Sequence, residues 1–468
     1  MAKRKKLSEL TVEELQSQQR DVAAELARRA ADSSGKQLTL SEMELQVEDL
    51  VGAGRPPAIL AMLSRMKPEK PTPKACPRCG QRAPVKARDR ERTVASLSGP
   101  VTLKRNYHYC AGCQHGFYPM DEKLGLPEGG QLSAELEKRV LDFAVNDVYG
   151  NVAERWSNHY RFGISDNLVR RVADRVGRMA EGADNIYLQQ EAQPAPKERA
   201  EILLVQNDGS MLCMRGNERW KEFKVGFIQR GRLIPEGDSH RFELLGKPRY
   251  VAEMTASTFE SALKAALHVE QAKQAGKVVW VADGAIVNWT LSAKLAPGCI
   301  QLLDFQHALQ HGVAFGKMLL GEGNPFVPLW QERIGFLLAS GNVDGLVNEL
   351  MECLLEAPAA AIAALDQLVG YYRSNQHRMR YHDARQFGLP IGSGHVESAH
   401  RHVLQTRMKR AGQLWSPMRA RRMARLRGIY RTAGATGFHK AVYQAHFLTR
   451  SAPAAKAAPR PKLRASNR

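Results

Sequence analysis

Apolar residues recur at helical spacing at the start of the chain and again after residue 131. In the first stretch, Thr11 with Glu14 and Ser41 with Glu44 each have the spacing of a helix-starting capping box. In the second stretch, one helix face collects apolar side chains at Leu136, Val140, Phe143 and Ala144. The pattern therefore predicts helices over residues 1–70 and 131–190.

From residue 199 the pattern changes to short apolar runs that are typical of buried strands. One helix is expected among them, over Thr258–Ala275, and helical periodicity then dominates residues 305–385. No repeat of fixed period is present. The predicted strands are Ile202–Val205, Phe223–Ile228, Tyr250–Met254, Val278–Val281 and Cys299–Leu303. We therefore predict a multidomain α+β protein in which the sheet strands precede a long helical stretch.

A helix, a break and a second helix follow one another in Asn151–Gly177. The break falls at Phe162 and Gly163, and Ser165 is placed to cap the second helix. This is the order of a helix-turn-helix unit, although a plain helical hairpin fits the same pattern. A helix-turn-helix would offer DNA the cations Arg170, Arg171 and Arg175.

The composition is that of a globular protein, with 43% hydrophobic and 25% charged residues in a chain of 468. No apolar run reaches the ~18 residues of a membrane span, and the basic first residues precede no apolar signal segment. The formal net charge is +20, and residues 398–468 contain 17 Lys or Arg and no Asp or Glu. We therefore expect a cytoplasmic protein with a nucleic-acid partner and a disordered basic tail over 451–468.

Four of the seven cysteines form two Cys-x-x-Cys pairs, Cys76 with Cys79 and Cys110 with Cys113. Each pair can offer two thiolates to one side of an ion, and together they supply the four tetrahedral ligands of a structural zinc site. His108 and His115 lie nearby, but four cysteines already complete the set. The spacing predicts one Zn²⁺ in a hairpin-built zinc ribbon over residues 74–130.

Acidic residues follow three of the predicted strands. Asp208 and Asp283 each precede a glycine after an apolar run, Asp304 ends the last strand, and Glu397 follows Gly392-Ser-Gly394. Acids at the ends of adjacent strands meet at one edge of a sheet, where their oxygens can hold Mg²⁺ or Mn²⁺. Taken singly, the two Asp-Gly pairs also fit turns, and Glu397 fits the first turn of a helix.

The order of these motifs resembles the DDE transposases of bacterial insertion sequences, and more narrowly the ISKra type and the Mutator-like group. The resemblance covers about residues 200–430. A basic run after the glutamate is similar to the Arg-x-Lys…Gly…Trp run of that family and is specific, whereas Asp-Gly alone is not. The matching motifs are Asp208-Gly, Asp283-Gly-Ala, Leu303-Asp304-Phe-Gln-His307, Gly392-Ser-Gly-His-Val-Glu397-Ser and Arg407-Met-Lys409-Arg410-Ala-Gly-Gln-Leu-Trp415-Ser.

The resemblance implies a ribonuclease-H-like core with an all-helical insertion before the glutamate. It makes Asp208, Asp283 and Glu397 the catalytic carboxylates, holding two Mg²⁺ or Mn²⁺ ions for in-line displacement at a phosphodiester. Asp304 and His307 match a supporting element, although another alignment makes Asp304 the second carboxylate. His307 either contacts the scissile strand or is a hydrogen-bonded residue at a helix start.

The basic run implies DNA contact behind the glutamate. Arg407, Lys409 and Arg410 would neutralise phosphates, and Trp415 would either stack on a base or anchor its helix. The expected partners are double-stranded DNA, both element ends and target, and further copies of the chain in a homo-oligomer on DNA. The expected location is the nucleoid of a bacterial cytoplasm.

Two other functions stay open. One is a zinc-ribbon DNA-binding regulator with an inactive core, and the other is a metal-dependent DNA nuclease without strand transfer.

The chain thus divides into several predicted parts. The predicted parts are N-terminal helices (1–70), a zinc ribbon (74–130), a helical DNA-binding region (131–190), the first part of the core (199–304), a helical insertion (305–390), the glutamate helix with basic helices (391–450) and the tail (451–468).

Overall fold

The computed structural model describes residues 7–33, 38–66, 69–127, 129–160, 162–181, 198–217, 219–353 and 359–451. They form two compact units that both contain helices and strands, one with residues 7–141 and 149–172 and the other with 142–148 and 173–451. The predicted helical region 131–190 is therefore shared between the units. The predicted disordered tail lies, beyond Ser451, outside the described residues. No helix in the described ranges combines the length and hydropathy that a membrane span requires.

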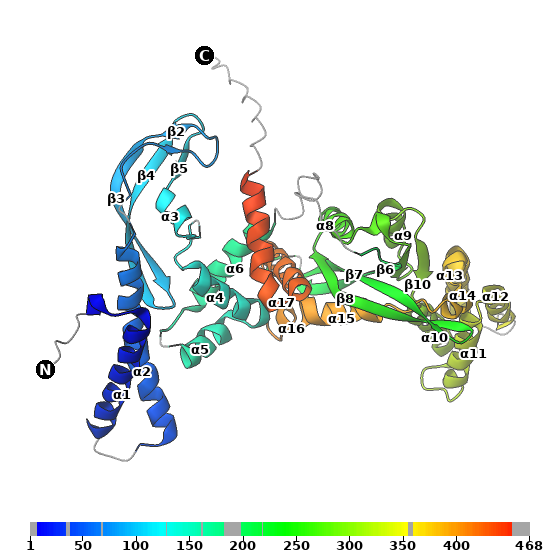
Figure 1. Cartoon of the computed structure of the whole chain (residues 1–468). Helices are drawn as coiled ribbons and strands as arrows, with labels where there is room; N and C mark the ends of the chain where they lie inside the picture. The colour runs from blue at the N-terminus through cyan, green and yellow to red at the C-terminus, as the bar shows by residue number, and fades with distance from the viewer. Residues whose placement is uncertain are drawn as a thin grey trace, which may run out of the picture. The chain divides into compact units, whose positions relative to one another are not determined.

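The first unit contains a helical hairpin and two small antiparallel sheets, followed by further helices (Figure 1). One sheet pairs β1 with β2, and the other has the order β3-β4-β5. Helices α4 and α6 each run across a boundary between the two units. The elements are α1 (Val12–Ser33), α2 (Leu40–Ser64), β1 (Lys74–Ala75), β2 (Arg82–Ala83), β3 (Val85–Ser96), β4 (Gly99–Cys110), β5 (His115–Phe117), α3 (Pro119–Lys123), α4 (Ala134–Asn146), α5 (Tyr149–His159) and α6 (Asp166–Ala180).

Capping boxes start the two helices of the hairpin. The predicted box at Thr11 is confirmed, because the Glu14 N–H donates to Thr11 Oγ1 at 3.2 Å and the Thr11 N–H donates to Glu14 Oε2 at 2.8 Å. The second box was wrong by two residues, since α2 is capped by Thr39 with Glu42 and not by Ser41. Both candidates have the same spacing, so spacing alone does not distinguish them.

The second unit is built on a five-stranded sheet with the order β10-β9-β6-β7-β8. The first three strands in the chain, β6 to β8, are antiparallel neighbours, and β9 and β10 then add in parallel on the other side of β6. Helix α8 connects β8 to β9, and α9 connects β9 to β10. The bounds are β6 (Ile202–Cys213), β7 (Trp220–Glu236), β8 (Ser239–Glu253), α8 (Ala256–Val269), β9 (Lys277–Ala282), α9 (Ile286–Leu295) and β10 (Ile300–Leu303).

Strand β6 extends further than its apolar run predicts. The sequence places its end at Asn207-Asp208-Gly209, but Asp208 pairs with Val225 and the ladder continues to Cys213. The apolar pattern stops early because the strand carries buried polar side chains from Gln206 onward. Asp208 therefore lies within a strand and not in a turn.

Helices cover both faces of the sheet. At Gly226 on β7, an added Cβ would lie 3.2 Å from Leu263 of α8, so the glycine permits close packing on that face. The neighbouring Phe227 points to the opposite face. There its ring stacks on His395 of helix α15 (Gly394–Ala399), with 5.2 Å between the ring centroids.

The segment between β10 and α15 is helical, as the sequence predicts. Its helices share one hydrophobic cluster with the sheet, so the segment is packed as part of the core. Members of that cluster include Leu203, Trp280, Leu309, Ile334, Leu346, Leu365 and Tyr372. The helices are α10 (Phe305–Leu320), α11 (Val327–Ala339), α12 (Val343–Glu352), α13 (Ala359–Asn375) and α14 (Tyr381–Gln386).

Four arginines of the acid-free C-terminal stretch are paired with acids from elsewhere in the same unit. After α15 the chain passes through a π-helical segment (His400–Gln405) and α16 (Thr406–Met408) to α17 (Pro417–Ser451). Ion pairs join Arg419 to Asp174, Arg421 and Arg422 to Glu181, and Arg425 to Glu253.

Arg427 of α17 is the most deeply buried of these arginines, with 1% exposure. Its guanidinium donates to the backbone oxygens of Val403, Val145 and His402, and to Thr406 Oγ1 at 2.8 Å. One side chain thus joins α17 to the π-helical segment and to the end of α4.

Replacing Arg427 by Ala should lower the free energy of unfolding by about 3 kcal/mol, because several buried oxygens lose their donor together. Urea unfolding, monitored by circular dichroism, measures this change. Arg401→Ala alters an exposed arginine of the π-helical segment and should change stability by less than about 0.5 kcal/mol. Equal unfolding midpoints for both variants would contradict the assigned role of Arg427.

Candidate active site and candidate zinc centre

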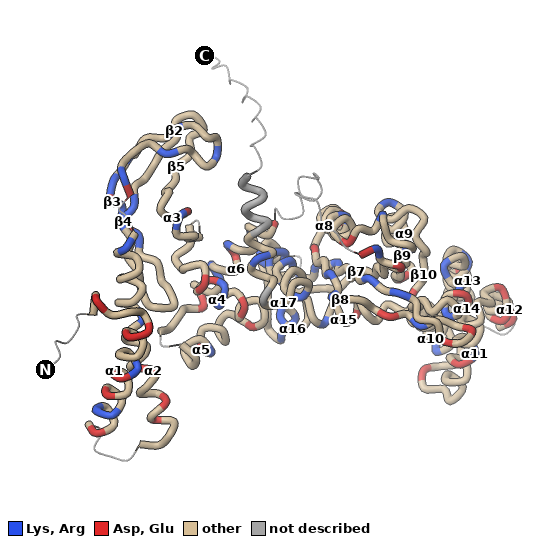
Figure 2. Tube along the Cα trace, in the orientation of Figure 1, with Lys and Arg blue, Asp and Glu red and all other residues tan. Residues whose placement is uncertain are grey.

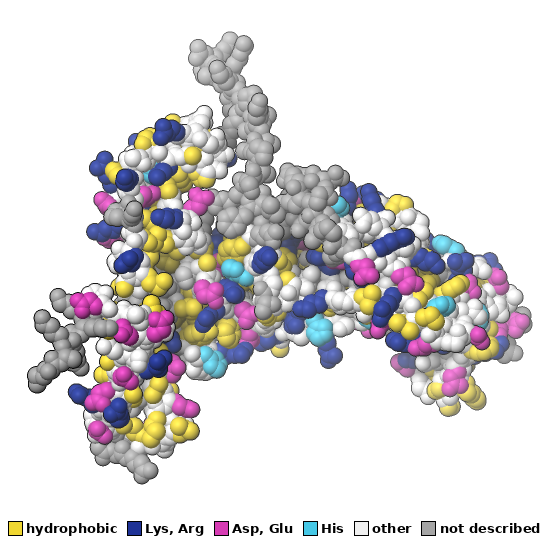
Figure 3. All heavy atoms as spheres, viewed as in Figure 1, with side chains coloured by type: hydrophobic (Ala, Val, Ile, Leu, Met, Phe, Trp, Pro, Cys, Tyr) yellow, Lys and Arg dark blue, Asp and Glu magenta, His cyan; other side chains and the backbone are white. Residues whose placement is uncertain are grey.

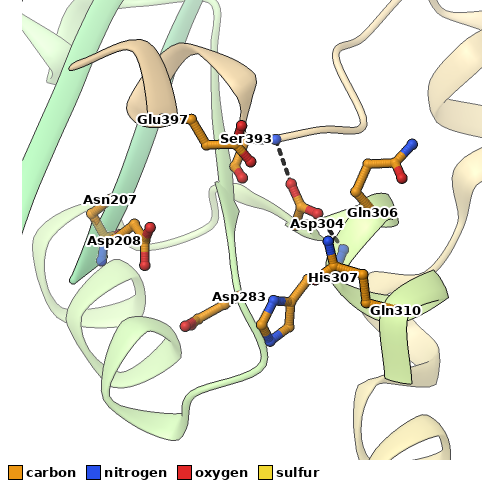
Figure 4. Close-up of a pocket in the computed structure, with 9 residues that line it drawn as sticks. All are labelled: Asn207, Asp208, Asp283, Asp304, Gln306, His307, Gln310, Ser393 and Glu397. Atoms are coloured by element: carbon orange, nitrogen blue, oxygen red, sulfur yellow. Dashed lines mark hydrogen bonds between the residues drawn. The ribbon is translucent and has the colours of Figure 1, made fainter. Parts of the chain in front are cut away.

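Five residues predicted from the sequence line one pocket of the second unit (Figure 4). Asp208 comes from within β6, Asp283 follows the end of β9, and Glu397 lies on α15. Asp304 and His307 lie at the start of α10. The lining is completed by Asn207, Gln306, Gln310 and Ser393. The fold therefore brings together acids that the sequence distributes over four segments.

Asp208 is the acid on the central strand, and its side chain is 39% exposed. Its Oδ1 accepts a hydrogen bond from the Gly209 N–H at 2.6 Å, and its Oδ2 lies 3.4 Å from Nε2 of the buried His400. Burial raises the pKa of Asp208, but the neighbouring His400 ring and the Gly209 N–H more than offset this, so the pKa lies below its usual range. Asp208 is therefore ionised at neutral pH, as a metal ligand must be.

Asp283 is held by a chain of buried side chains that begins in the sheet. Trp280 Nε1–H donates to Asn207 Oδ1 at 2.8 Å, and Asn207 Nδ2 donates to Asn288 Oδ1 at 2.6 Å. Asn288 Nδ2 then donates to Asp283 Oδ1 at 2.5 Å, and the Ala285 N–H donates to the same oxygen at 3.1 Å. The position of Asp283 is thereby tied to strand β6.

Glu397 is positioned by a second buried amide, that of Gln206, which has no exposed surface. Gln206 Nε2 donates to the Gly392 carbonyl at 2.9 Å, and its Oε1 accepts from the Val396 N–H at 3.0 Å. Both contacts fall just before Glu397, so they clamp the start of α15 to β6. Because residues 206 and 208 share one strand face, the clamp holds Glu397 on the side of Asp208.

Asp304 is 4% exposed, and both of its carboxylate oxygens accept backbone hydrogen bonds. Oδ1 accepts from the His307 N–H at 2.6 Å, which caps α10, and Oδ2 accepts from the Ser393 N–H at 2.5 Å. Asp304 thus ties α10 to the loop before Glu397, as Figure 4 shows. This use of both oxygens leaves Asp304 less available than Asp283 as the second of the predicted metal-binding carboxylates.

Four residues of this arrangement were not singled out in the sequence. Gln206 and Asn207 carry a usable signal, because two amides interrupt an apolar strand directly before Asp208 and buried amides require partners. Asn288 and His400 carry no such signal, since the strand residues that they contact, Asn207 and Asp208, lie far away in the sequence.

Gly284 follows Asp283 for a steric reason. An added Cβ would lie 2.3 Å from Cε2 of Tyr371 on α13, whose ring fills that space. The Tyr371 ring also contacts His311 at 4.4 Å between centroids, and His311 contacts His307 at 5.0 Å. A row of rings therefore connects the helical insertion to the pocket.

The structure corrects the predicted DNA contact of Arg407. This side chain is 1% exposed, and its Nε donates to the Ala144 carbonyl at 3.2 Å, so it packs inside the unit and does not face a phosphate. Trp415 is 5% exposed and donates from Nε1 to the Met408 carbonyl at 3.1 Å. Of the two roles considered for Trp415, the structure favours anchoring.

Lys409 and Arg410 are both exposed, but the two charges are not equally available to a ligand. Arg410 forms an ion pair with Asp147 at 2.9 Å. Lys409 Nζ donates to Ser210 Oγ at 2.6 Å, which places an ammonium beside β6, two residues beyond Asp208. Lys409 is therefore the better placed of the two for a phosphate at the pocket.

Helices α5 and α6 follow each other around a short break, in the order expected of a helix-turn-helix. The Ser165 hydroxyl accepts from the Leu168 N–H at 3.2 Å, so the predicted cap is confirmed. On α6, Arg171 is exposed whereas Arg170 and Arg175 are half-buried. DNA contact by these three arginines stays a prediction.

The four cysteines of the two Cys-x-x-Cys pairs lie together in the first unit. Cys76 Sγ lies 3.5 Å from Cys113 Sγ, and Cys79 Sγ lies 3.5 Å from Cys110 Sγ. Among the described residues, they are the one group of three or more possible metal ligands whose ligand atoms all lie within 4.8 Å of one another. Zinc–sulfur bonds of about 2.3 Å require sulfurs about 3.8 Å apart in a tetrahedron. The thiols are therefore close to the spacing that a zinc ion needs.

His108 makes other contacts and is not needed as a metal ligand beside the four cysteines. It is fully buried, its Nδ1 lies 3.1 Å from the Ala83 carbonyl oxygen, and its ring stacks on Phe117 at 5.4 Å between centroids. The cysteines could hold a metal ion such as zinc without it.

We expect one zinc ion per chain, and Cys110→Ser should lose it and locally unfold residues 74–117, because metal binding there contributes folding free energy. Elemental analysis and hydrogen exchange measure the two effects. Cys299→Ser, a thiol outside the cluster, should keep full zinc content. Protein purified without chelator and free of stoichiometric zinc would contradict the assignment.

Comparison with protein families gives a match over residues 34–442 to the model of an uncharacterised protein family, UPF0236. The matched range includes the four cysteines and the entire pocket. A search of curated proteins gave no match. Since the family model covers far more than half of the sequence, the chain belongs to the uncharacterised protein family UPF0236.

Proposed function

We propose that this protein is a DDE-type DNA transposase, which cuts the ends of a mobile element and joins them to target DNA. The observation that carries the proposal is the meeting of Asp208, Asp283 and Glu397 in one pocket. Asp208 lies within β6, Asp283 follows β9, and Glu397 lies on α15, after a helical segment like the insertion that the transposase resemblance implies. Membership of UPF0236 is compatible with this function.

The sheet of the second unit supports a ribonuclease-H-like core. Numbered from β6 to β10 as strands 1 to 5, the order is 3-2-1-4-5, with strands 1 to 3 antiparallel and strands 4 and 5 parallel to strand 1. The first acid lies on strand 1, and the second follows strand 4. Parallel neighbours present their carboxyl ends at one edge, where a site can form.

The donor set fits divalent cations. Asp208, Asp283 and Glu397 provide hard carboxylate oxygens, the ligands that Mg²⁺ and Mn²⁺ prefer, and would hold the ions. When bound, the ions would activate the attacking oxygen and stabilise the leaving 3′ oxygen. These carboxylates lie further apart than the clustered cysteine sulfurs, so ion binding would draw their side chains inward.

The protein's own groups position the acids and the DNA backbone. Gln206 and Asn207 fix two acidic segments relative to the central strand, which preorganises the site before substrate arrives. Lys409 offers a cation beside that strand for the phosphate. His307 lines the same pocket and is close enough to the acids to contact a scissile strand.

Asp208→Asn, Asp283→Asn and Glu397→Gln should each reduce Mg²⁺-dependent cleavage by on the order of a thousandfold or more, and double variants should be no worse than single ones. The reason is that the three carboxylates act as one unit. Oligonucleotide assays with the DNA that flanks the coding region, scored for nicks and joined products, measure both steps.

Asp304→Asn serves as the comparison for these variants. It keeps the cap on α10 but replaces the acceptor of the Ser393 N–H, so it should cost stability and only part of the activity. An active Asp283→Asn beside a folded but inactive Asp304→Asn would reverse the assignment. Cleavage without joined products would favour a nuclease, and no cleavage by wild-type protein would favour a regulator.

Asn288→Ala should lower metal affinity and cleavage by about 10–100-fold, because it breaks the link that orients Asp283. The loss should appear as a higher Mg²⁺ concentration for half-maximal rate in folded protein, and the unfolding midpoint should also fall because the buried Asn207 loses its partner. Thr290→Ala, at an exposed position of the same helix, is the matched control. An unaltered Mg²⁺ dependence in Asn288→Ala would show that the amide chain does not position Asp283.

A further inference from the structure

The β3–β4 hairpin and its cysteine turns concentrate positive charge in the first unit. Residues 74–117 contain nine Lys or Arg but only two Asp or Glu. Figure 2 shows these cations distributed along β3 and β4, and Figure 3 shows Lys and Arg side chains at the surface there. The question is which of these charges are available to a partner.

Two of the nine cations stabilise the fold locally. Arg92 and Arg105 both pair with Asp121 of α3, and their side chains are 12% and 11% exposed. Arg92 also donates to the carbonyls of Pro127 and Gly130, and the Arg105 guanidinium lies 3.6 Å from the Tyr118 ring centroid. These two side chains hold α3 against the hairpin and are not free for a ligand.

Six others form the set that we call the ribbon cations. Each is exposed, and none makes an ion pair with any residue that the structure describes. The ribbon cations are Arg78, Arg82, Lys86, Arg88, Arg90 and Lys104. The hairpin thus carries charge that its own fold does not use.

The basic C-terminal part of the second unit behaves differently. There Arg419, Arg421, Arg422 and Arg425 are matched by acids, and Arg427 is buried on carbonyl oxygens. The sequence concentrates net charge in that stretch, but these five arginines are already paired with acids or buried. Positive charge available to a polyanion is therefore better placed on the hairpin.

The shape of the hairpin suits duplex DNA. Strands β3 and β4 are 12 residues each, about 40 Å when extended, and β5 adds three residues at one end of β4. Apart from a bridge between Ala95 and Leu132 near the turn, the rest is a two-stranded antiparallel ribbon, which is narrow enough for a major groove. Register shifts near Asp89, whose φ is 48°, bend the strand beside the ribbon cations.

We infer that the β3–β4 hairpin binds duplex DNA through its ribbon cations, chiefly by contacts to phosphates. This rests on the proposed function for the choice of DNA as the polyanion. The cysteine turns place Arg78 and Arg82 at the base of the hairpin, so a metal there would order part of the surface. Phosphate contacts position a protein on the duplex without reading its sequence.

The test is the salt dependence of binding of the full chain to a random-sequence duplex, by fluorescence anisotropy. Lys86→Ala, Arg88→Ala and Arg90→Ala combined should flatten the log–log slope by about two to three units, at about 0.9 per lost phosphate contact. The matched control removes three exposed charges from α1 as Arg20→Ala, Arg28→Ala and Arg29→Ala. It should leave the slope unchanged, because residues 12–64 contain nine acidic and five basic residues.

An unchanged slope in the hairpin variant, with normal zinc content and unfolding midpoint, would overturn the inference. So would equal losses in the hairpin and α1 variants, or an equally strong effect of the hairpin variant on binding to poly-glutamate, which would indicate an acidic protein partner. Failure of the proposed function has a different signature. A wild-type chain that binds DNA through the hairpin but never cleaves it would refute the transposase and leave the binding surface standing.

Discussion

Buried amide groups on β6 determine the geometry of the second unit, because each must find hydrogen-bond partners away from water. Successive strand residues point to opposite faces, so Gln206 reaches α15 while Asn207 reaches α9. The Asp208 side chain lies on the same strand face as that of Gln206. Two consecutive residues, Gln206 and Asn207, thus connect the central strand to the segments that carry Glu397 and Asp283. Their hydrogen bonds stabilise the sheet and the pocket at the same time.

The helical insertion is held to this framework by packing. It shares a hydrophobic cluster with the sheet, and Tyr371 occupies the space that a side chain at position 284 would need. Because protein interiors are close-packed, a change in either element is felt by the other. The insertion therefore contributes to the shape of the pocket although no insertion residue beyond α10 lines it.

Local signals made several features predictable. The apolar runs of β9 and β10 end where Asp283 and Asp304 leave the sheet, and the cysteine spacing identifies its own ligand set. The length of β6 was not predictable from polarity, since its buried amides are satisfied by segments more than 70 positions away. The burial of Arg407 could not be predicted either, because its acceptor is a backbone carbonyl 263 positions earlier in the sequence.

The π-helical segment between Glu397 and Lys409 has a consequence for chain length. A π-helical turn accommodates an extra residue, and each residue advances an α-helix by about 100°. Loss of one residue from His400–Gln405 would allow regular α-helix but rotate everything beyond it relative to Glu397. Arg407 would leave its carbonyl acceptor, and Lys409 would turn away from Ser210. A single insertion or deletion in this stretch would therefore separate the acid from the cation that follows it.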